Sequence, residues 1–333
     1  MAVLQKIDNP YGMIQTVEHC ESFSIYRSQD SSGDCEVTVY PVFSGIELVY
    51  YDVHMQSCDI NLAKGREMLI ITHCQEGRIE FEYKNGEYLY LASGDLSIQK
   101  NTENIRHRYC PLSHYHGVSV AIDMNRVPRC FSCILDDVFV SPEELEMKFC
   151  SEKPYSIMRE NISIEHIFSE LYSVPENIRK GYHKVKVLEL LLFLSGLEYK
   201  GESEERRYFS RSQVTAAKEA KKYLLAHLDE HITITELADM LGISSTSLKI
   251  CFKGVYGDTI NGYITNCKMQ KAASLLKNTD KSVLEIAGIV GYNNGSKFAG
   301  AFRRVMNKSP NEYRKSLVCT EPYMSVKSSK KTL

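Results

Sequence analysis

The chain has 333 residues, of which 43% are hydrophobic, enough for the cores of two domains. No apolar run approaches the roughly 18 residues of a membrane-spanning helix, and the start lacks the basic and then apolar pattern of a secretion signal. The net charge of −2 hides an asymmetry: residues 211–333 hold 19 basic and 10 acidic side chains, so they carry +9 and the rest −11. A basic third joined to an acidic remainder is typical of a polyanion-binding module attached to a second function.

The eleven cysteines are odd in number and show no disulfide-like spacing. Without an export signal, we expect reduced thiols in a cytoplasm and no contact with a membrane. Cys130 and Cys133 form the one close pair in the sequence. A zinc site of this type needs a second pair, which is missing, so no metal or redox role is expected for them.

Residues 1–135 predict an antiparallel β-domain. Residues 35–40 and 78–83 alternate apolar and polar side chains, as half-buried strands do. Asn85-Gly86, between two alternating runs, indicates a two-residue hairpin. Many short strands separated by turns favour a small barrel or sandwich.

Residues 136–200 predict helices. Ser141 before Pro142 is a typical helix start, and residues 157–172 and 178–197 are two longer helical runs. One side of the last run carries Val185, Leu188, Leu191, Leu192 and Ser195. This stripe could cover the β-domain or meet a second copy of the chain. The charged residues 201–212 are expected to be a linker.

The last hundred residues contain an internal repeat. Thr233 with Glu236, and Ser282 with Glu285, have the spacing of a capping box, in which a hydroxyl begins a helix and a carboxylate follows three residues later. Each short helix is expected to end at a glycine in the left-handed conformation, either Gly242 or Gly291. These pairs lie 49 residues apart.

A second helix follows each glycine. Leu248 and Phe252 anchor the first to the core, and Phe298 and Phe302 anchor the second, 50 residues later. Capped helix, glycine turn and second helix together predict a helix-turn-helix, twice. A linking helix over residues 264–277 would separate the units, so that their second helices could enter major grooves about 34 Å apart.

This arrangement resembles the DNA-binding domain of the AraC/XylS family of bacterial transcription regulators. The residues that carry the resemblance are Leu237-Ala238, Gly242, Leu248, Phe252, Gly257, the run from Ser282 to Tyr292, Phe298, Phe302-Arg303-Arg304, Ser309-Pro310, Tyr313 and Arg314. The resemblance implies transcriptional control, RNA polymerase as a partner, and an amino-terminal sensor of cupin-like form.

We therefore expect a multidomain α+β chain. Its parts are a cupin-like antiparallel β-barrel that senses an effector (1–135), a helical dimerisation and coupling region (136–200), a linker (201–212), an all-α AraC-type domain with two helix-turn-helix units (213–316) and a polar basic tail (317–333). The homodimer would pair two DNA-binding modules. Activation and repression are equally open at this stage.

The family reads bases with the exposed face of each second helix. The matching positions here are Ser245, Thr246, Lys249, Ile250, Asn294, Ser296, Lys297 and Gly300. Ile250 and Gly300 depart from the polar or basic side chains usual at their positions; Ile250 could contact a thymine methyl, and Gly300 can only permit close approach. The phosphate contacts, which position without specifying, are expected from Lys253, Arg303, Arg304 and Lys308.

Two roles compete for the β-rich part. Effector binding is favoured, with His73, Arg78, Tyr83, Tyr88 and Tyr90 as candidate lining residues; alternatively, this part only dimerises an effector-independent regulator. A metal-dependent cupin enzyme is the less favoured alternative. His114 and His116 point to the same side of a strand, but the following positions lack the expected glutamate. No catalytic residue, metal or other cofactor is expected.

Overall fold

The computed structural model describes residues 16–20, 22–57, 66–100, 105–129, 140–159, 161–199 and 209–318. The chain divides into two compact units. The amino-terminal unit holds residues up to Ser212 and the short segment Gly254–Gly257, and the carboxy-terminal unit holds the remainder from Gln213. Cys130, Cys133, and most of the predicted linker and tail lie outside the described residues. Among those described, no helix combines the length and apolar character that crossing a membrane requires.

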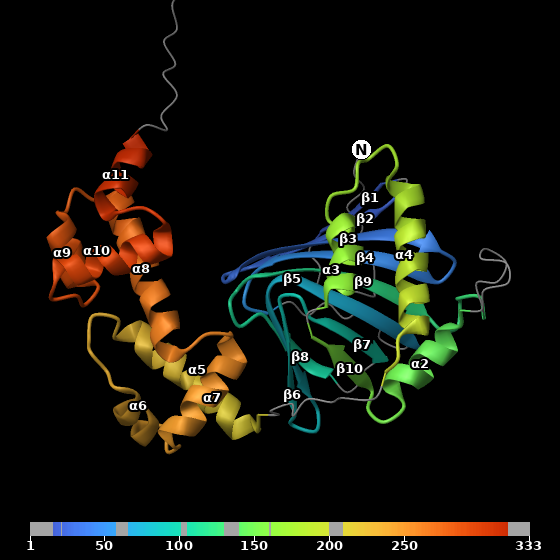
Figure 1. Cartoon of the computed structure of the whole chain (residues 1–333), viewed down its shortest axis with the longest axis horizontal. Coiled ribbons are helices and arrows are strands. Elements are labelled where there is room, and N and C mark those ends of the chain that lie inside the picture. Colours follow the sequence, from blue (N-terminus) through green and yellow to red (C-terminus); the bar gives the residue numbers. More distant parts are fainter. Residues whose placement is uncertain are drawn as a thin grey trace, which may run out of the picture. The chain divides into compact units, whose positions relative to one another are not determined.

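The amino-terminal unit is built on a ten-stranded antiparallel sheet (Figure 1). Its strands are β1 (Thr16–His19), β2 (Ser24–Asp30), β3 (Gly33–Phe43), β4 (Ile46–His54), β5 (Met68–Tyr83), β6 (Tyr88–Ala92), β7 (Leu96–Lys100), β8 (Ile105–Tyr109), β9 (Tyr115–Asp123) and β10 (Tyr155–Met158). The main path runs β1-β2-β3-β4-β9-β5-β7-β10, and β6 and β8 both pair with β5. The antiparallel sheet followed by helices confirms the predicted α+β class, whereas a cupin-like closure stays a prediction.

Alternation along the strands gives the sheet two apolar faces. Leu48 on β4 lies opposite Val120 on β9, and both belong to a core that includes Phe168 and Leu190 from the helices. Val49, the next residue on β4, is buried in a second core on the opposite face. Because neighbouring side chains on a strand point to opposite faces, one sequence can supply both cores. The helices α2 (Pro142–Cys150), α3 (Ile162–Leu171) and α4 (Arg179–Gly196) cover the first face (Figure 1).

Two expectations for this unit are corrected. Residues 157–172 do not form one helix, because β10 occupies Tyr155–Met158 and pairs with β7, and α3 begins after the capping residue Asn161. Tertiary pairing with a sheet edge overrides a local helical pattern in so short a segment. The hairpin at Asn85-Gly86 is present, but Tyr83 N donates to Glu87 O, so three residues form the loop instead of two. Gly86, with φ of 84°, takes the left-handed position that such a loop requires.

The carboxy-terminal unit is helical throughout its described elements. They are α5 (Arg211–Ala226), α6 (Ile234–Met240), α7 (Ser245–Tyr256), α8 (Ile260–Asn278), α9 (Val283–Ile289), α10 (Gly295–Met306) and α11 (Pro310–Val318). The predicted repeat is visible in their bounds, since α6 and α9 are 49 residues apart and α7 and α10 are 50 apart. The linking helix α8 is longer than the predicted 264–277 and contributes Met269 and Leu276 to a core with Phe298 and Phe302.

Local hydrogen bonds set the ends of the short helices. Both predicted capping boxes form: Thr233 caps α6 and Ser282 caps α9, each with the glutamate three residues on returning the bond to the cap backbone. Gly242 and Gly291 have φ of 66° and 77°, the left-handed conformation predicted for them. The turn geometry of both helix-turn-helix units is therefore a local property of the sequence.

Candidate nucleic-acid interface and ligand cavity

The second helix of each unit, α7 or α10, has one buried side and one open side. Leu248 and Phe252 on α7, and Phe298 and Phe302 on α10, are fully buried. Each helix starts at a side-chain cap: Ser247 N donates to Ser244 Oγ at 3.1 Å, and Lys297 N donates to Asn294 Oδ1 at 3.0 Å. The aromatic anchors fix which side of each helix remains open.

The predicted base-reading positions lie on the open sides. Thr246, Lys249, Asn294, Ser296, Lys297 and Gly300 are exposed, and Ser245 and Ile250 are half-buried. Asn294 has a structural task that the sequence analysis missed, because its carbonyl oxygen caps α10. Only its amide nitrogen then remains to donate to a base edge.

Gly300 has no steric reason to be glycine. A β-carbon built there would meet no atom within 4 Å among the described residues, although the residue sits inside α10. Glycine in a helix interior costs about 1 kcal/mol relative to alanine. Alanine would fit at this position, yet the residue is glycine. On the open side of α10, the missing side chain would let another molecule approach the helix closely.

The predicted phosphate-contacting residues are all exposed cations: Lys253, Arg303, Arg304 and Lys308. Within the described parts of the chain, no carboxylate lies within ion-pairing distance of these four residues. The same holds for Lys249 and Lys297. Their charges are therefore available to an external anion. The separation of α7 and α10, predicted as about 34 Å, stays a prediction.

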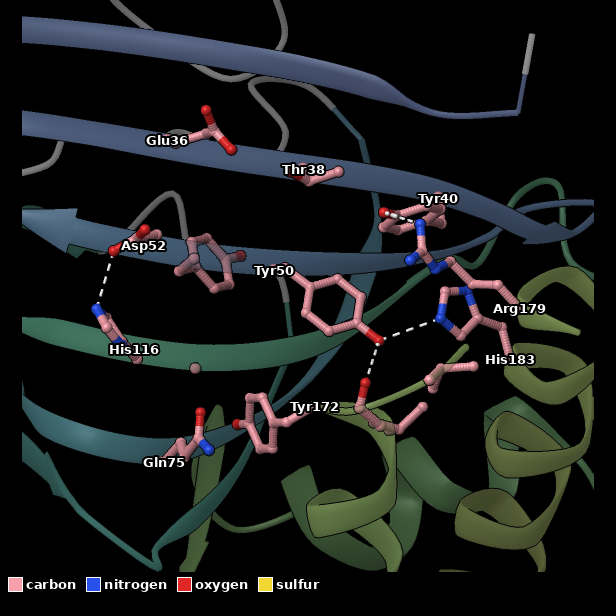
Figure 2. Close-up of a pocket in the computed structure, with 14 residues that line it drawn as sticks. Glu36, Thr38, Tyr40, Tyr50, Asp52, Gln75, His116, Tyr172, Arg179 and His183 are labelled. Carbon is pink, nitrogen blue, oxygen red and sulfur yellow. Dashed lines mark hydrogen bonds and ion pairs between the residues drawn. The ribbon is translucent and has the colours of Figure 1, made fainter. Parts of the chain in front are cut away.

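The amino-terminal unit contains a cavity of about 350 Å³ between the sheet and its helices (Figure 2). Its lining residues are Glu36, Thr38, Tyr40, Tyr50, Tyr51, Asp52, Gln75, His116, Gly117, Leu171, Tyr172, Val174, Arg179 and His183. They come from β3, β4, β5, β9 and α4, from the end of α3 and from the segment that joins α3 to α4. The mixture of tyrosine rings with charged and amide groups suits a small polar ligand that also presents an apolar face.

One wall of the cavity is held by a hydrogen-bonded group that ties β4 to the helices. Tyr50 Oη donates to the Leu171 carbonyl at 3.0 Å and lies 3.2 Å from His183 Nε2 (Figure 2). Since Tyr50 has one proton, a neutral His183 with its proton on Nε2 completes the pair. Burial, and then the Arg179 guanidinium, lower the pKa of His183 to about 4. Arg179 also donates to Tyr40 Oη at 3.4 Å.

The five predicted effector residues do not gather at this cavity, nor at a smaller one of about 40 Å³ near Tyr115. His73 stacks on Phe168, and Tyr83 stacks on Tyr155. Tyr90 donates a hydrogen bond to Glu80, and the Arg78 guanidinium lies over the Tyr90 ring. Tyr88 is buried on β6. Their role in ligand binding stays a prediction. Sequence alone missed the cavity because its walls come from segments up to 147 residues apart, Glu36 and His183.

The carboxy-terminal repeat is similar to domains of known proteins. Residues 237–316 match the family model described as a helix-turn-helix domain. The xylose operon regulatory protein of Escherichia coli is 31% identical over 153 residues, which are 43% of this chain and 39% of that protein. The melibiose operon regulatory protein of Escherichia coli is 30% identical over 93 residues, 28% and 31% of the two chains.

The repeat is an AraC-type DNA-binding domain. The predicted resemblance is thereby confirmed. Among solved structures, the carboxy-terminal domain of AraT, a response regulator from Geobacillus stearothermophilus, is 32% identical, with a TM-score of 0.30, covering 30% of this chain and 84% of that one.

The AraC-type domain contains both second helices, because the matched residues 237–316 include α7 and α10. The chain spans about two fifths or less of the length of these curated relatives. The family match covers none of the residues that line the cavity, so it gives no information about the role of the cavity.

Proposed function

We propose that this protein is a sequence-specific DNA-binding transcription regulator. The observation that carries the proposal is the pair of AraC-type second helices, each anchored by buried aromatic rings and each presenting an exposed lysine, Lys249 or Lys297. Lysine and the neighbouring Ser, Thr and Asn side chains can hydrogen-bond to base edges in the major groove. Lys253, Arg303, Arg304 and Lys308 would hold the phosphates on either side.

The test begins with a selection of binding sites from random duplexes by the full chain. The selected duplex and a shuffled duplex are then compared by fluorescence anisotropy over a range of salt concentrations. A shared motif bound at least 1,000-fold more tightly than the shuffled sequence, about 4 kcal/mol, supports the proposal. If no motif emerges from the selection, the protein does not act by reading DNA sequence.

The cavity is proposed to hold the effector. Its tyrosine rings offer flat apolar surfaces, and Glu36, Asp52, Gln75 and Arg179 offer donors and acceptors, which together suit a sugar or a similar polyhydroxylated molecule. A ligand that binds one arrangement of the chain more tightly than another would shift the population toward it and so change DNA binding.

Thermal unfolding of the full chain with a panel of sugars and sugar acids tests the effector role. A ligand should raise the unfolding temperature of the wild type and have a weaker effect on Arg179→Ala, while Met147→Ala, on the exposed side of α2, should respond like the wild type. If no member of a broad metabolite panel stabilises the protein, the effector-independent alternative is favoured.

A homodimer is proposed through α4. Ile178, Val185 and Leu192 recur every seven residues at the start and along α4 and are 48%, 61% and 44% exposed. A repeat of seven keeps apolar side chains on one side of a helix, as pairs of packed helices require. Two copies of the AraC-type domain would then act together, with RNA polymerase as the partner on which the regulator works.

A further inference from the structure

Three histidines and a carboxylate meet at the end of the β4–β9 strand pair. Asp52 on β4 lies directly opposite His116 on β9, and Val53 lies opposite Tyr115. His54 is the last residue of β4, and His114 directly precedes β9. Because side chains two residues apart point to the same face, this register places Asp52, His54, His114 and His116 on one face of the sheet.

The side chains turn toward one another. His54 Nε2 and His116 Nε2 are 3.4 Å apart, and Asp52 Oδ1 lies 2.9 Å from the former and 2.8 Å from the latter. One ring nitrogen from each of the three histidines lies within 4.8 Å of the others. The Asp52–His116 contact is visible at the edge of the cavity in Figure 2.

We propose that His54, His114 and His116 bind a divalent transition-metal ion of the Zn²⁺ type. Asp52 lies against the His54 and His116 nitrogens and would support these two ligands. Nitrogen ligands at about 2.0–2.1 Å from a tetrahedral zinc ion are separated by roughly 3.3 Å, which agrees with the spacing of the His54 and His116 nitrogens. Three imidazole ligands suit zinc, nickel or copper rather than magnesium or calcium.

A neighbouring carboxylate supports the ligand geometry. Glu76 Oε2 lies 3.3 Å from His114 Nε2. A carboxylate that holds one ring nitrogen fixes the orientation of the ring and leaves Nδ1 to bind the metal. The histidine side chains are 31% to 48% exposed, so an ion can reach them without unfolding of the sheet.

The proposed site departs from the expectation from sequence that His114 and His116 bind no metal. The missing ligand is His54, which lies sixty residues earlier and is brought in by strand pairing. Asp52 and His116 also line the 350 Å³ cavity, so an ion at this site would sit at its wall. The proposal rests on this geometry alone and stands or falls independently of the regulatory function.

Cobalt titration of the full, metal-stripped chain tests the site. Co²⁺ reports tetrahedral coordination by its visible absorption, and thiolate ligands add a separate near-ultraviolet band that exposes binding by any of the eleven cysteines. We expect one equivalent of Co²⁺ per chain without the thiolate band, displaced by one equivalent of Zn²⁺. The double variant His54→Ala, His116→Ala should bind at least 100-fold more weakly, and Asp52→Asn should bind about 10- to 100-fold more weakly.

His107→Ala is the matched control, since His107 lies on β8 outside the cluster, and its affinity should equal that of the wild type. Circular dichroism of each metal-free variant checks that the fold is kept. The proposal is overturned if the double variant binds Co²⁺ as tightly as the wild type, if the bound ion shows thiolate absorption, or if the wild type binds no equivalent at all.

Discussion

Single residues of α10 fall into two groups: some are needed for folding, and others lie on the open side without a contact that the fold requires. Phe298 is required by the core, and Asn294 by the start of α10. Lys297 and Gly300, one turn apart on the same helix, have no task in the described structure. Substitutions at these two positions therefore report on DNA binding rather than on folding.

Gly300→Ala should stabilise the protein and weaken DNA binding together. Alanine would gain up to about 1 kcal/mol of unfolding free energy in a helix interior, while its methyl group would keep α10 from the groove floor. Gly288→Ala on α9, where a β-carbon also meets nothing within 4 Å, is the matched control and should stabilise without affecting binding. Denaturant unfolding and anisotropy measure the two effects; unchanged binding by Gly300→Ala would contradict the close-approach argument.

Lys297→Ala should weaken binding to the selected site more than binding to bulk DNA. If Lys297 reads a base, the difference is about 1–3 kcal/mol. Arg303→Ala, six residues further along α10, should instead weaken binding to both DNAs. It should also reduce the slope of log affinity against log salt concentration by about one. Titrations of the selected and shuffled duplexes measure these losses of affinity. An equal loss of affinity for both duplexes would show that Lys297 contacts the DNA backbone and not a base.

His183 should make stability depend on pH. Its folded-state pKa of about 4 is below the usual 6.5, so the unfolded chain takes up the proton first as pH falls. The free energy of unfolding should therefore fall between pH 6.5 and pH 4, by up to about 1 kcal/mol per pH unit. Denaturant unfolding of His183→Gln should show a flatter pH dependence of the unfolding free energy in this window than the wild type.

At the scale of elements, each helix-turn-helix depends on a glycine with positive φ after its first helix. Gly242 and Gly291 share this backbone conformation but differ in surroundings. A β-carbon at Gly242 would meet nothing within 4 Å, whereas at Gly291 it would lie 2.6 Å from the backbone oxygen of Asp229. The second turn thus packs closely on the segment that follows α5.

Gly291→Ala should therefore cost more stability than Gly242→Ala. The left-handed conformation alone costs an alanine about 1–2 kcal/mol, and this applies to both variants. The contact with Asp229 adds a backbone clash at Gly291 only. Denaturant unfolding measures both variants, and Gly242→Ala serves as the control for the left-handed conformation. Equal losses of unfolding free energy would show that the turn can move away from Asp229.

For the whole molecule, the proposed homodimer depends on the apolar residues along α4. The predicted stripe along α4 divides in the structure: Leu191 is buried in the core under the helix, while Val185 and Leu192 are exposed. The amphipathic pattern in the sequence could not separate these two sides, because the buried Leu191 and the exposed Leu192 are neighbours in the same predicted stripe.

Val185→Glu and Leu192→Glu should each shift the full chain toward the monomer. A charge placed in an apolar contact would have to be buried without a partner, which is costly. Met147→Glu on α2, where the native side chain is 63% exposed, is the control for added charge and should leave the assembly unchanged. Sedimentation equilibrium measures the effect; a wild type that is monomeric at every concentration would contradict the dimer.

The AraC-type domain could be predicted from the amino-acid sequence, because its signals act over a few residues. A hydroxyl and a glutamate three residues apart cap a helix, and a glycine ends it, wherever the rest of the chain lies. The cavity, the strand at Tyr155–Met158 and the cluster of His54, His114 and His116 became visible only in the folded chain. Each of these arises when strand pairing joins segments far apart in the chain, and alternation within one strand does not reveal which strand will lie beside it.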